Sequence, residues 1–184
     1  MMPVNAPNDK LDILAPSFNL KNVDDQMVSL QDTKGLNGTV IVFICNHCPY
    51  VKAIASRLKK DSDELLEHSI NTIAIMSNDV ANYPDDSFEN MKIFSKKYKF
   101  NFPYLYDDTQ KVAKKYNAVC TPDFFGFDKN LKLKYRGRLD SGVINSNKNS
   151  MIERELFKAM IRIKNEGVAP SNQINSIGCS IKWK

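Results

Sequence analysis

Residues 40–49 read Val-Ile-Val-Phe-Ile-Cys-Asn-His-Cys-Pro, and this stretch decides the fold. Its first five residues are apolar and mostly β-branched, which predicts a fully buried strand. A proline suits the first turn of a helix, and apolar residues recur after Pro49 at the spacing of one helix face. These residues are Val51, Ile54, Ala55, Leu58 and Leu65. The two cysteines therefore lie where a strand leads into a helix.

This position favours reactive thiols. The free amide groups and the dipole at a helix N-terminus stabilise negative charge, so a thiol there becomes a thiolate near neutral pH. The imidazole of His47 belongs to the same turn and can tune the thiolate. We interpret Cys45 and Cys48 as a redox-active dithiol.

Two other interpretations of the C-x-x-C motif are weaker. A structural zinc site needs a second pair of ligands at short spacing, and the chain offers only Cys120, Cys179 and His68, each isolated in sequence. Two cysteines buried for packing alone would not require the surrounding turn, histidine and proline. The sequence therefore predicts neither a bound metal nor a cofactor.

Composition bounds the class of protein. The chain has 184 residues and suits one domain with a sizeable core. Its net charge of +5 comes from scattered lysines without interleaved aromatics, so no nucleic-acid partner is expected. We expect no membrane association and a cytoplasmic location, because no apolar run is long enough to span a bilayer and the first residues do not resemble a signal peptide. Four cysteines in such a protein indicate catalysis rather than a disulfide scaffold.

The pattern along the chain predicts one α/β domain at residues 10–167. A loosely held arm at residues 1–9 precedes it, and a tail at residues 168–184 follows and docks on it. Residues 18–20 and 27–30 predict a β-hairpin. The strand at 40–44, the helix to about residue 67 and the strand at 70–76 form a βαβ unit with parallel strands.

The second half of the domain continues this alternation. Ser87 is expected to cap one helix and Thr109 a shorter one. A strand at 119–127 is entered through a proline, and residues 131–136 pair back on it as an antiparallel strand. A closing helix at 151–165 ends at Gly167.

Four motifs in this order resemble one family. They are Phe43-Ile-Cys-Asn-His-Cys-Pro-Tyr-Val51, Cys120-Thr-Pro-Asp-Phe-Phe125, Tyr135-Arg-Gly-Arg-Leu-Asp140 and Gly178-Cys-Ser-Ile-Lys-Trp183. Together they resemble the peroxiredoxin-like redoxins (AhpC/TSA type) of the thioredoxin fold, over roughly residues 10–184. The resemblance implies an α/β thioredoxin-like fold, with a central mixed sheet flanked by helices and an N-terminal β-hairpin extension.

The resemblance also implies roles for residues. Cys45 takes the place of the nucleophilic cysteine, and Cys48 takes the place of the cysteine that resolves mixed disulfides. Thr121 and Pro122 take the place of a Thr-Pro pair whose proline is cis, faces the dithiol and positions the substrate backbone. Sequence alone leaves a trans proline at a strand start equally open. A histidine before the second cysteine, like His47, is found in disulfide isomerases and makes the disulfide more oxidising.

These roles predict a thiol-disulfide oxidoreductase. Its substrate would be a protein or small-molecule disulfide, and its reductant a thiol such as thioredoxin or glutathione. The alternative is a peroxiredoxin-like thiol peroxidase acting on peroxide, with Cys45 or Cys48 as the peroxidatic cysteine. Neither register places the family's threonine three residues before that cysteine, which disfavours fast peroxide chemistry. A copper-binding assembly factor of the same fold is a weaker alternative, because no histidine follows His68.

Three other positions are candidate accessory residues. Cys120 is either an extra resolving thiol or a small core residue, and buried free cysteine is common. Arg138 and its neighbour Arg136 could lower a thiol pKa, or could be solvated cations at a strand edge. Cys179 lies in an apolar tail, where it either resolves an oxidised Cys45 or Cys48 or packs on the far face of the domain. We favour packing, because Cys45 already has a partner in Cys48.

Overall fold

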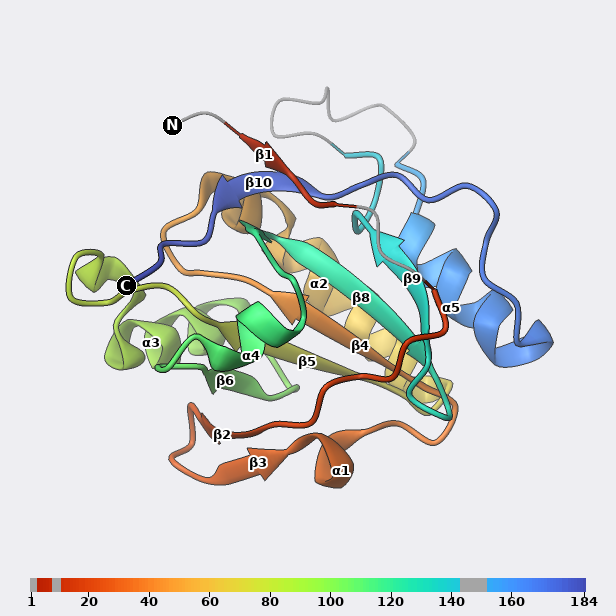
Figure 1. Cartoon of the computed structure of the whole chain (residues 1–184), viewed down its shortest axis with the longest axis horizontal. Coiled ribbons are helices and arrows are strands. Elements are labelled where there is room, and N and C mark those ends of the chain that lie inside the picture. The colour runs from red at the N-terminus through yellow and green to blue at the C-terminus, as the bar shows by residue number, and fades with distance from the viewer. Residues whose placement is uncertain (1–2, 8–10, 143–151) are drawn as a thin grey trace.

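A computed structural model of the chain describes residues 3–7, 11–142 and 152–184 (Figure 1). Its centre is a seven-stranded mixed sheet with the strand order β3-β2-β6-β5-β4-β8-β9. The strands are β2 (Asn19–Asn22), β3 (Met27–Ser29), β4 (Gly38–Phe43), β5 (Ile70–Met76), β6 (Tyr104–Tyr106), β8 (Asp123–Asp128) and β9 (Leu133–Gly137). The predicted thioredoxin-like mixed sheet is confirmed, and so is the antiparallel β2–β3 hairpin at its edge.

Helices cover both faces of this sheet. They are α1 (Leu30–Thr33), α2 (Pro49–Glu67), the 3-10 helix η1 (Pro84–Asp86), α3 (Phe88–Tyr98), α4 (Lys111–Lys115) and α5 (Glu155–Glu166). Side chains of α2, α3 and α5 pack in one buried cluster, and those of α4 pack in a second cluster. Among the described residues, no helix is both long and apolar enough to cross a membrane.

Strand β4 lies inside the seven-stranded sheet, between β5 and β8, and all of its residues are buried there. It runs parallel to β5 and antiparallel to β8, which confirms the predicted βαβ unit. Successive side chains of a strand point to opposite faces. Val40 and Val42 accordingly join the cluster with α2 and α5, whereas Ile41 and Phe43 join the cluster with α4. Residues that follow β4 are therefore held between two packed layers.

The helix boundaries test the predicted caps. Ser87 caps α3 by accepting a hydrogen bond from the amide of Asn90, as expected. Gly167 ends α5 with φ of 70°, also as expected. The prediction that Thr109 caps the next helix is wrong, because α4 begins at Lys111 with Gln110 as its cap residue. The carboxylate of Asp107 accepts hydrogen bonds from amides in the first turn of α4 and so replaces the threonine.

The two ends of the chain meet in a second, three-stranded sheet that the sequence did not predict. Its strands are β1 (Val4–Asn5), β10 (Ile177–Ser180) and β7 (Cys120–Thr121), in the order β1-β10-β7 and all antiparallel. Figure 1 shows β1 lying along β10 at one end of the molecule. Within residues 3–7 the arm is therefore paired rather than loosely held, and residues 1–2 and 8–9 lie outside the described part of the chain.

Candidate active site

The two cysteines lie in the turn between β4 and α2. After β4, Ile44 still donates its amide hydrogen to the carbonyl of Ile75, so the turn begins at Cys45. Cys48 is the N-cap residue of α2, which starts at Pro49. Both cysteine side chains are fully buried. The structure thus places Cys48 at the helix N-terminus, and Cys45 one short loop before it.

Thr121 contacts both sulfur atoms. Its hydroxyl lies 3.3 Å from Sγ of Cys45, and its backbone carbonyl oxygen lies 3.2 Å from Sγ of Cys48. The peptide bond between Thr121 and Pro122 is cis. The Thr-Pro pair therefore faces the dithiol, and its proline is cis, as the resemblance implies.

The surroundings of the two thiols separate their acidities. The Cys48 pKa falls to about 5, mainly because the Cys45 thiol stabilises the Cys48 thiolate. Burial opposes this shift, but the Cys179 thiol and the amides of Val51 and Cys179 lower the pKa further. The Cys45 pKa rises well above its usual value of 9.0, because its proton is shared with Cys48, its side chain is buried and the Asp86 charge is near. The lowered pKa expected at the helix N-terminus therefore belongs to Cys48.

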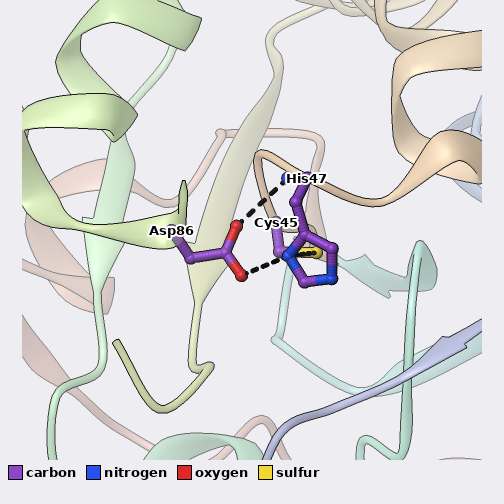
Figure 2. A group of neighbouring side chains, drawn as sticks. All are labelled: Cys45, His47 and Asp86. Atoms are coloured by element: carbon purple, nitrogen blue, oxygen red, sulfur yellow. Dashed lines mark hydrogen bonds and ion pairs between the residues drawn. The ribbon is translucent and has the colours of Figure 1, made fainter. Parts of the chain in front are cut away.

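His47 forms an ion pair with Asp86. The imidazole Nδ1 lies 2.6 Å from Oδ2 of Asp86 and 3.9 Å from Sγ of Cys45 (Figure 2). The hydrogen bond to the carboxylate raises the His47 pKa. Tyr83 stacks on the imidazole with ring centroids 5.9 Å apart. The expected cation beside the dithiol is present, but a carboxylate partly balances its charge.

Sequence reasoning missed Asp86, which the structure places at the end of the 3-10 helix η1. Its carboxylate is fully buried and accepts hydrogen bonds from the amides of Asn46 and His47, from the His47 ring and from the side chain of Asn78. Burial alone would raise the Asp86 pKa, but these hydrogen bonds outweigh burial and lower it. Because Asp86 lies forty positions from Asn46 along the chain, no local pattern in the sequence indicates the contact.

A metal ion could be held by Cys45, His47 and Asp86, since each offers one ligand atom and these atoms lie within 4.8 Å of one another. In the structure the ring nitrogen is committed to the hydrogen bond with Asp86. A tetrahedral zinc site would need a fourth ligand, and copper(I) prefers sulfur and imidazole to a carboxylate. The arrangement fits an ion pair beside a thiol better than a metal centre.

The other two cysteines differ in their relation to the dithiol. Cys120 is buried, its thiol lies 3.7 Å from the carbonyl of Pro122, and burial raises its pKa. These features suit a packing residue. Cys179 lies on β10 directly across from Thr121. The prediction that the tail packs on the far face of the domain is therefore wrong, because the tail docks beside Thr121, next to the dithiol.

The two arginines are bound to carboxylates. Arg138 donates two hydrogen bonds to Glu155, at 2.6 and 2.7 Å. Arg136 is buried and pairs with Asp123 at 2.8 Å. Arg136 is thus part of the core rather than a solvated cation, and Arg138 holds the start of α5.

A mostly apolar hollow adjoins Pro122 on the side of α2. Its lining residues are Tyr50, Ala53, Ile54, Pro122, Phe124, Arg138, Leu139, Asp140, Gly142, Ser176 and Ile177. One charged residue of each sign lies at this hollow, and one wall is the start of β10. A hollow of this composition beside Pro122 could receive an apolar side chain of a bound molecule.

Comparisons with known proteins agree with this geometry. Residues 13–136 match the model of the AhpC/TSA family. "Peroxiredoxin Q, chloroplastic" from Oryza sativa subsp. japonica is 29% identical over 112 residues, which is 61% of this chain and 47% of that protein. The chain thus spans about half the length of the curated relatives it matches.

Solved structures extend the likeness over the whole chain. A crystal structure described as an uncharacterized conserved protein from Geobacillus kaustophilus is 45% identical, with a TM-score of 0.93, and covers 100% of this chain and 97% of its own. A hypothetical protein from Sinorhizobium meliloti 1021 is 31% identical, with a TM-score of 0.90 and 98% of both chains covered. A secreted Mycobacterium tuberculosis disulfide oxidoreductase, 18% identical over 78% of this chain and 94% of its own, has a TM-score of 0.58 and shares the fold.

Proposed function

Since the chain belongs to the AhpC/TSA family, a group of thiol-based redox proteins, we propose that it is a thiol-disulfide oxidoreductase whose dithiol is Cys45 and Cys48. The observation that carries this proposal is the placement of two sulfur atoms in the turn before α2, both in contact with Thr121 of the cis Thr121–Pro122 peptide. One sits at a helix N-terminus with a pKa of about 5, and its neighbour remains protonated. Such a pair can supply a thiolate for attack and a second thiol for resolution.

The position of Cys48 at the helix cap and its lowered pKa support Cys48 as the attacking thiolate, whereas the resemblance gave that role to Cys45. Cys48 attacks one sulfur of a substrate disulfide, forming a mixed disulfide and releasing a first substrate thiolate. That thiolate takes the proton of Cys45, which then attacks Sγ of Cys48. The products are the Cys45–Cys48 disulfide and the second substrate thiolate. A thiol such as thioredoxin or glutathione would return the protein to its reduced form.

The neighbouring residues have matching roles in this proposal. The His47 imidazolium, 3.9 Å from Cys45, would stabilise the thiolate that forms there during resolution. Thr121 and Pro122 would position the backbone of a disulfide-bearing substrate, and the apolar hollow would receive one of its side chains. These features suit a disulfide carried on a peptide or on a small organic molecule.

A thiol peroxidase is the second candidate, because Cys48-Pro49 opens a helix with a thiolate at its cap. The hydroxyl of Thr121, 3.3 Å from Cys45, could stand in for the threonine that the linear pattern lacks. In this case a peroxide would oxidise a cysteine to a sulfenic acid with release of water or an alcohol, and a neighbouring thiol would displace water from the sulfenic acid.

Reaction with 2,2′-dipyridyl disulfide tests the proposal, because each attack releases an absorbing thione. Wild type should react at a rate that levels off above about pH 6, as the pKa of Cys48 requires. Cys48→Ser should lose this fast reaction, while Cys45→Ser and the control Cys120→Ser should keep it. A fast reaction in Cys48→Ser that is lost in Cys45→Ser would restore Cys45 as the nucleophile.

Peroxide consumption separates the two candidates. The oxidoreductase proposal predicts that hydrogen peroxide is consumed much more slowly than a small disulfide when dithiothreitol is supplied as reductant. Faster consumption of peroxide than of disulfide by wild type, lost in Cys48→Ser, would favour the peroxidase instead.

A further inference from the structure

Strand β10 lies along β7, the short strand whose Thr121 contacts the dithiol. It pairs antiparallel with β7, with Cys179 opposite Thr121 and Ser180 opposite Cys120. Thr121 is the residue whose carbonyl and hydroxyl contact the two active-site sulfurs. A substrate segment positioned by Thr121 and Pro122 would need the same edge. The protein's own tail already lies there and presents a cysteine.

A glycine allows this close approach. A Cβ atom at Gly178 would lie 2.0 Å from the carbonyl oxygen of Thr121 and 3.0 Å from the nitrogen of Pro122. Both contacts are with backbone, which cannot move aside as a flexible side chain could. Any larger residue at position 178 would therefore push β10 away from the Thr-Pro peptide.

The thiol of Cys179 also interacts with the dithiol. Cys179 is buried and lies opposite Thr121, whose backbone carbonyl is 3.2 Å from Sγ of Cys48, so the Cys179 thiol is one of the groups that set the pKa of Cys48. Burial, followed by this interaction, raises the Cys179 pKa to about 12, so the group is a thiol beside the Cys48 thiolate. Cys48 therefore has two protonated partners, Cys45 on its own turn and Cys179 on the tail.

Hydrogen bonds beyond β10 hold the tail near the site. The amide of Lys182 donates to Oδ1 of Asn78 at 2.9 Å, and the other end of that side chain donates to Asp86 at 2.7 Å. The amide of Lys184 donates to the side chain of Gln110 at 2.9 Å. One asparagine thus connects the tail to the His47–Asp86 ion pair.

We propose that β10 is a built-in occupant of the substrate edge and that Cys179 is a third redox thiol, which resolves mixed disulfides on Cys48. This inference rests on the proposed function. Since Cys45 and Cys48 are fully buried, β10 moves aside to admit a substrate, and it returns after the first half of the substrate has left as a thiolate. The tail then competes with Cys45 for the same sulfur.

The covalent steps balance without a further reactant. Cys48 thiolate attacks the substrate disulfide and releases one substrate thiolate, which removes the proton of Cys179. Cys179 thiolate then attacks Sγ of Cys48, which forms the Cys48–Cys179 disulfide and expels the second substrate thiolate. Cys45 can attack Cys48 in turn, and this exchange gives the Cys45–Cys48 disulfide and a free Cys179 thiol.

Hydroxyethyl disulfide and mass mapping test the inference. Cys45→Ser should release two equivalents of mercaptoethanol and contain a Cys48–Cys179 disulfide. Cys45→Ser/Cys179→Ser should release one equivalent and keep mercaptoethanol on Cys48. If both variants release one equivalent, or if both release two, the inference is overturned. If wild type does not react with hydroxyethyl disulfide, the proposed function fails instead.

Diamide, which joins neighbouring thiols directly, decides the role of Cys179 even if wild type does not react with hydroxyethyl disulfide. In the Cys45→Ser background it should link Cys48 to Cys179. Adding Gly178→Ala should reduce this link at least tenfold, because β10 is displaced while every remaining thiol is retained. Ser180→Ala, on the same strand, adds no bulk toward β7 and should leave the link unchanged. Absence of the link in Cys45→Ser alone would overturn the inference.

Discussion

Replacing Asp86 by asparagine should disrupt the polar network beneath the dithiol. The carboxylate accepts four hydrogen bonds, two of them from the His47 ring and the Asn78 amide. Both of these donors reach Oδ2, and the amides of Asn46 and His47 reach Oδ1, so the new amide nitrogen would face two donors in either orientation. The His47 cation would also lose its partner. Breaking a buried ion pair costs about 3–5 kcal/mol, and one hydrogen bond to a charged group is worth about 1.5–3 kcal/mol.

The expected loss of unfolding free energy is smaller than the upper value of about 5 kcal/mol for a broken buried ion pair. His47 is only partly buried, so it can give up its proton instead of remaining an unpaired cation. We therefore expect Asp86→Asn to lower the free energy of unfolding by about 2–3 kcal/mol near pH 5.5, or roughly 5–10 °C in Tm for a chain of this size. Asp85→Asn, at the exposed neighbouring position, is the matched control and should cost less than about 0.5 kcal/mol.

The pH dependence identifies the ion pair as the cause. Folding raises the His47 pKa, so the stability from that group is complete below its ordinary value of 6.5 and is lost as pH rises through the raised value. Folding lowers the Asp86 pKa, so its contribution is complete above 3.8 and is lost as pH falls through the lowered value. Urea unfolding should therefore show a larger difference between wild type and Asp86→Asn near pH 5.5 than near pH 9. An equal difference at both pH values would refute this reasoning.

Four further substitutions probe the scaffold, each by urea unfolding. Asp123→Asn should lower the free energy of unfolding by about 3 kcal/mol, because the buried Arg136 would then face a neutral group at this position. Glu155→Gln, at the more exposed ion pair with Arg138, should lower it by less than about 1 kcal/mol. Equal losses would argue against burial as the cause. Ser87→Ala should cost about 1 kcal/mol through loss of the α3 cap, and no loss would mean that the cap bond contributes nothing. Gly126→Ala should cost about 1–3 kcal/mol, because the new Cβ would lie 2.6 Å from the sulfur of a core methionine; a neutral result would show that this methionine repacks freely.

Much of the fold could be predicted because its main elements carry their own patterns. The apolar run of β4, the helical spacing after Pro49 and the serine before α3 each act over a few residues, and each was confirmed. The second sheet could not be predicted in this way. Strands β1 and β7 have two residues each, which is too short for any alternation to be visible, and their pairing is fixed only when both chain ends meet.

The same distinction between local and distant residues applies to the active site. Cys48 at the helix cap follows from the order of residues 40–49, since strand, turn and helix are adjacent in the chain. The partners that tune it come from elsewhere: Asp86 from a 3-10 helix and Cys179 from the last strand. Local sequence shows which residues are reactive, but not which distant carboxylate or thiol sets their protonation. The family resemblance assigns the nucleophile to Cys45, whereas we propose Cys48 because of its position at the helix cap and its lowered pKa.

The position of β10 in the chain has a consequence for biosynthesis. Residues 177–180 leave the ribosome after every other described element of the domain, and until then β7 lacks its neighbour in the smaller sheet. A nascent chain that has already folded β4 and α2 therefore still lacks the strand that pairs with Thr121, the residue in contact with both active-site sulfurs. Cys179 and the tail therefore join the dithiol only at the end of domain synthesis, so the order of synthesis itself sets when the third thiol becomes available.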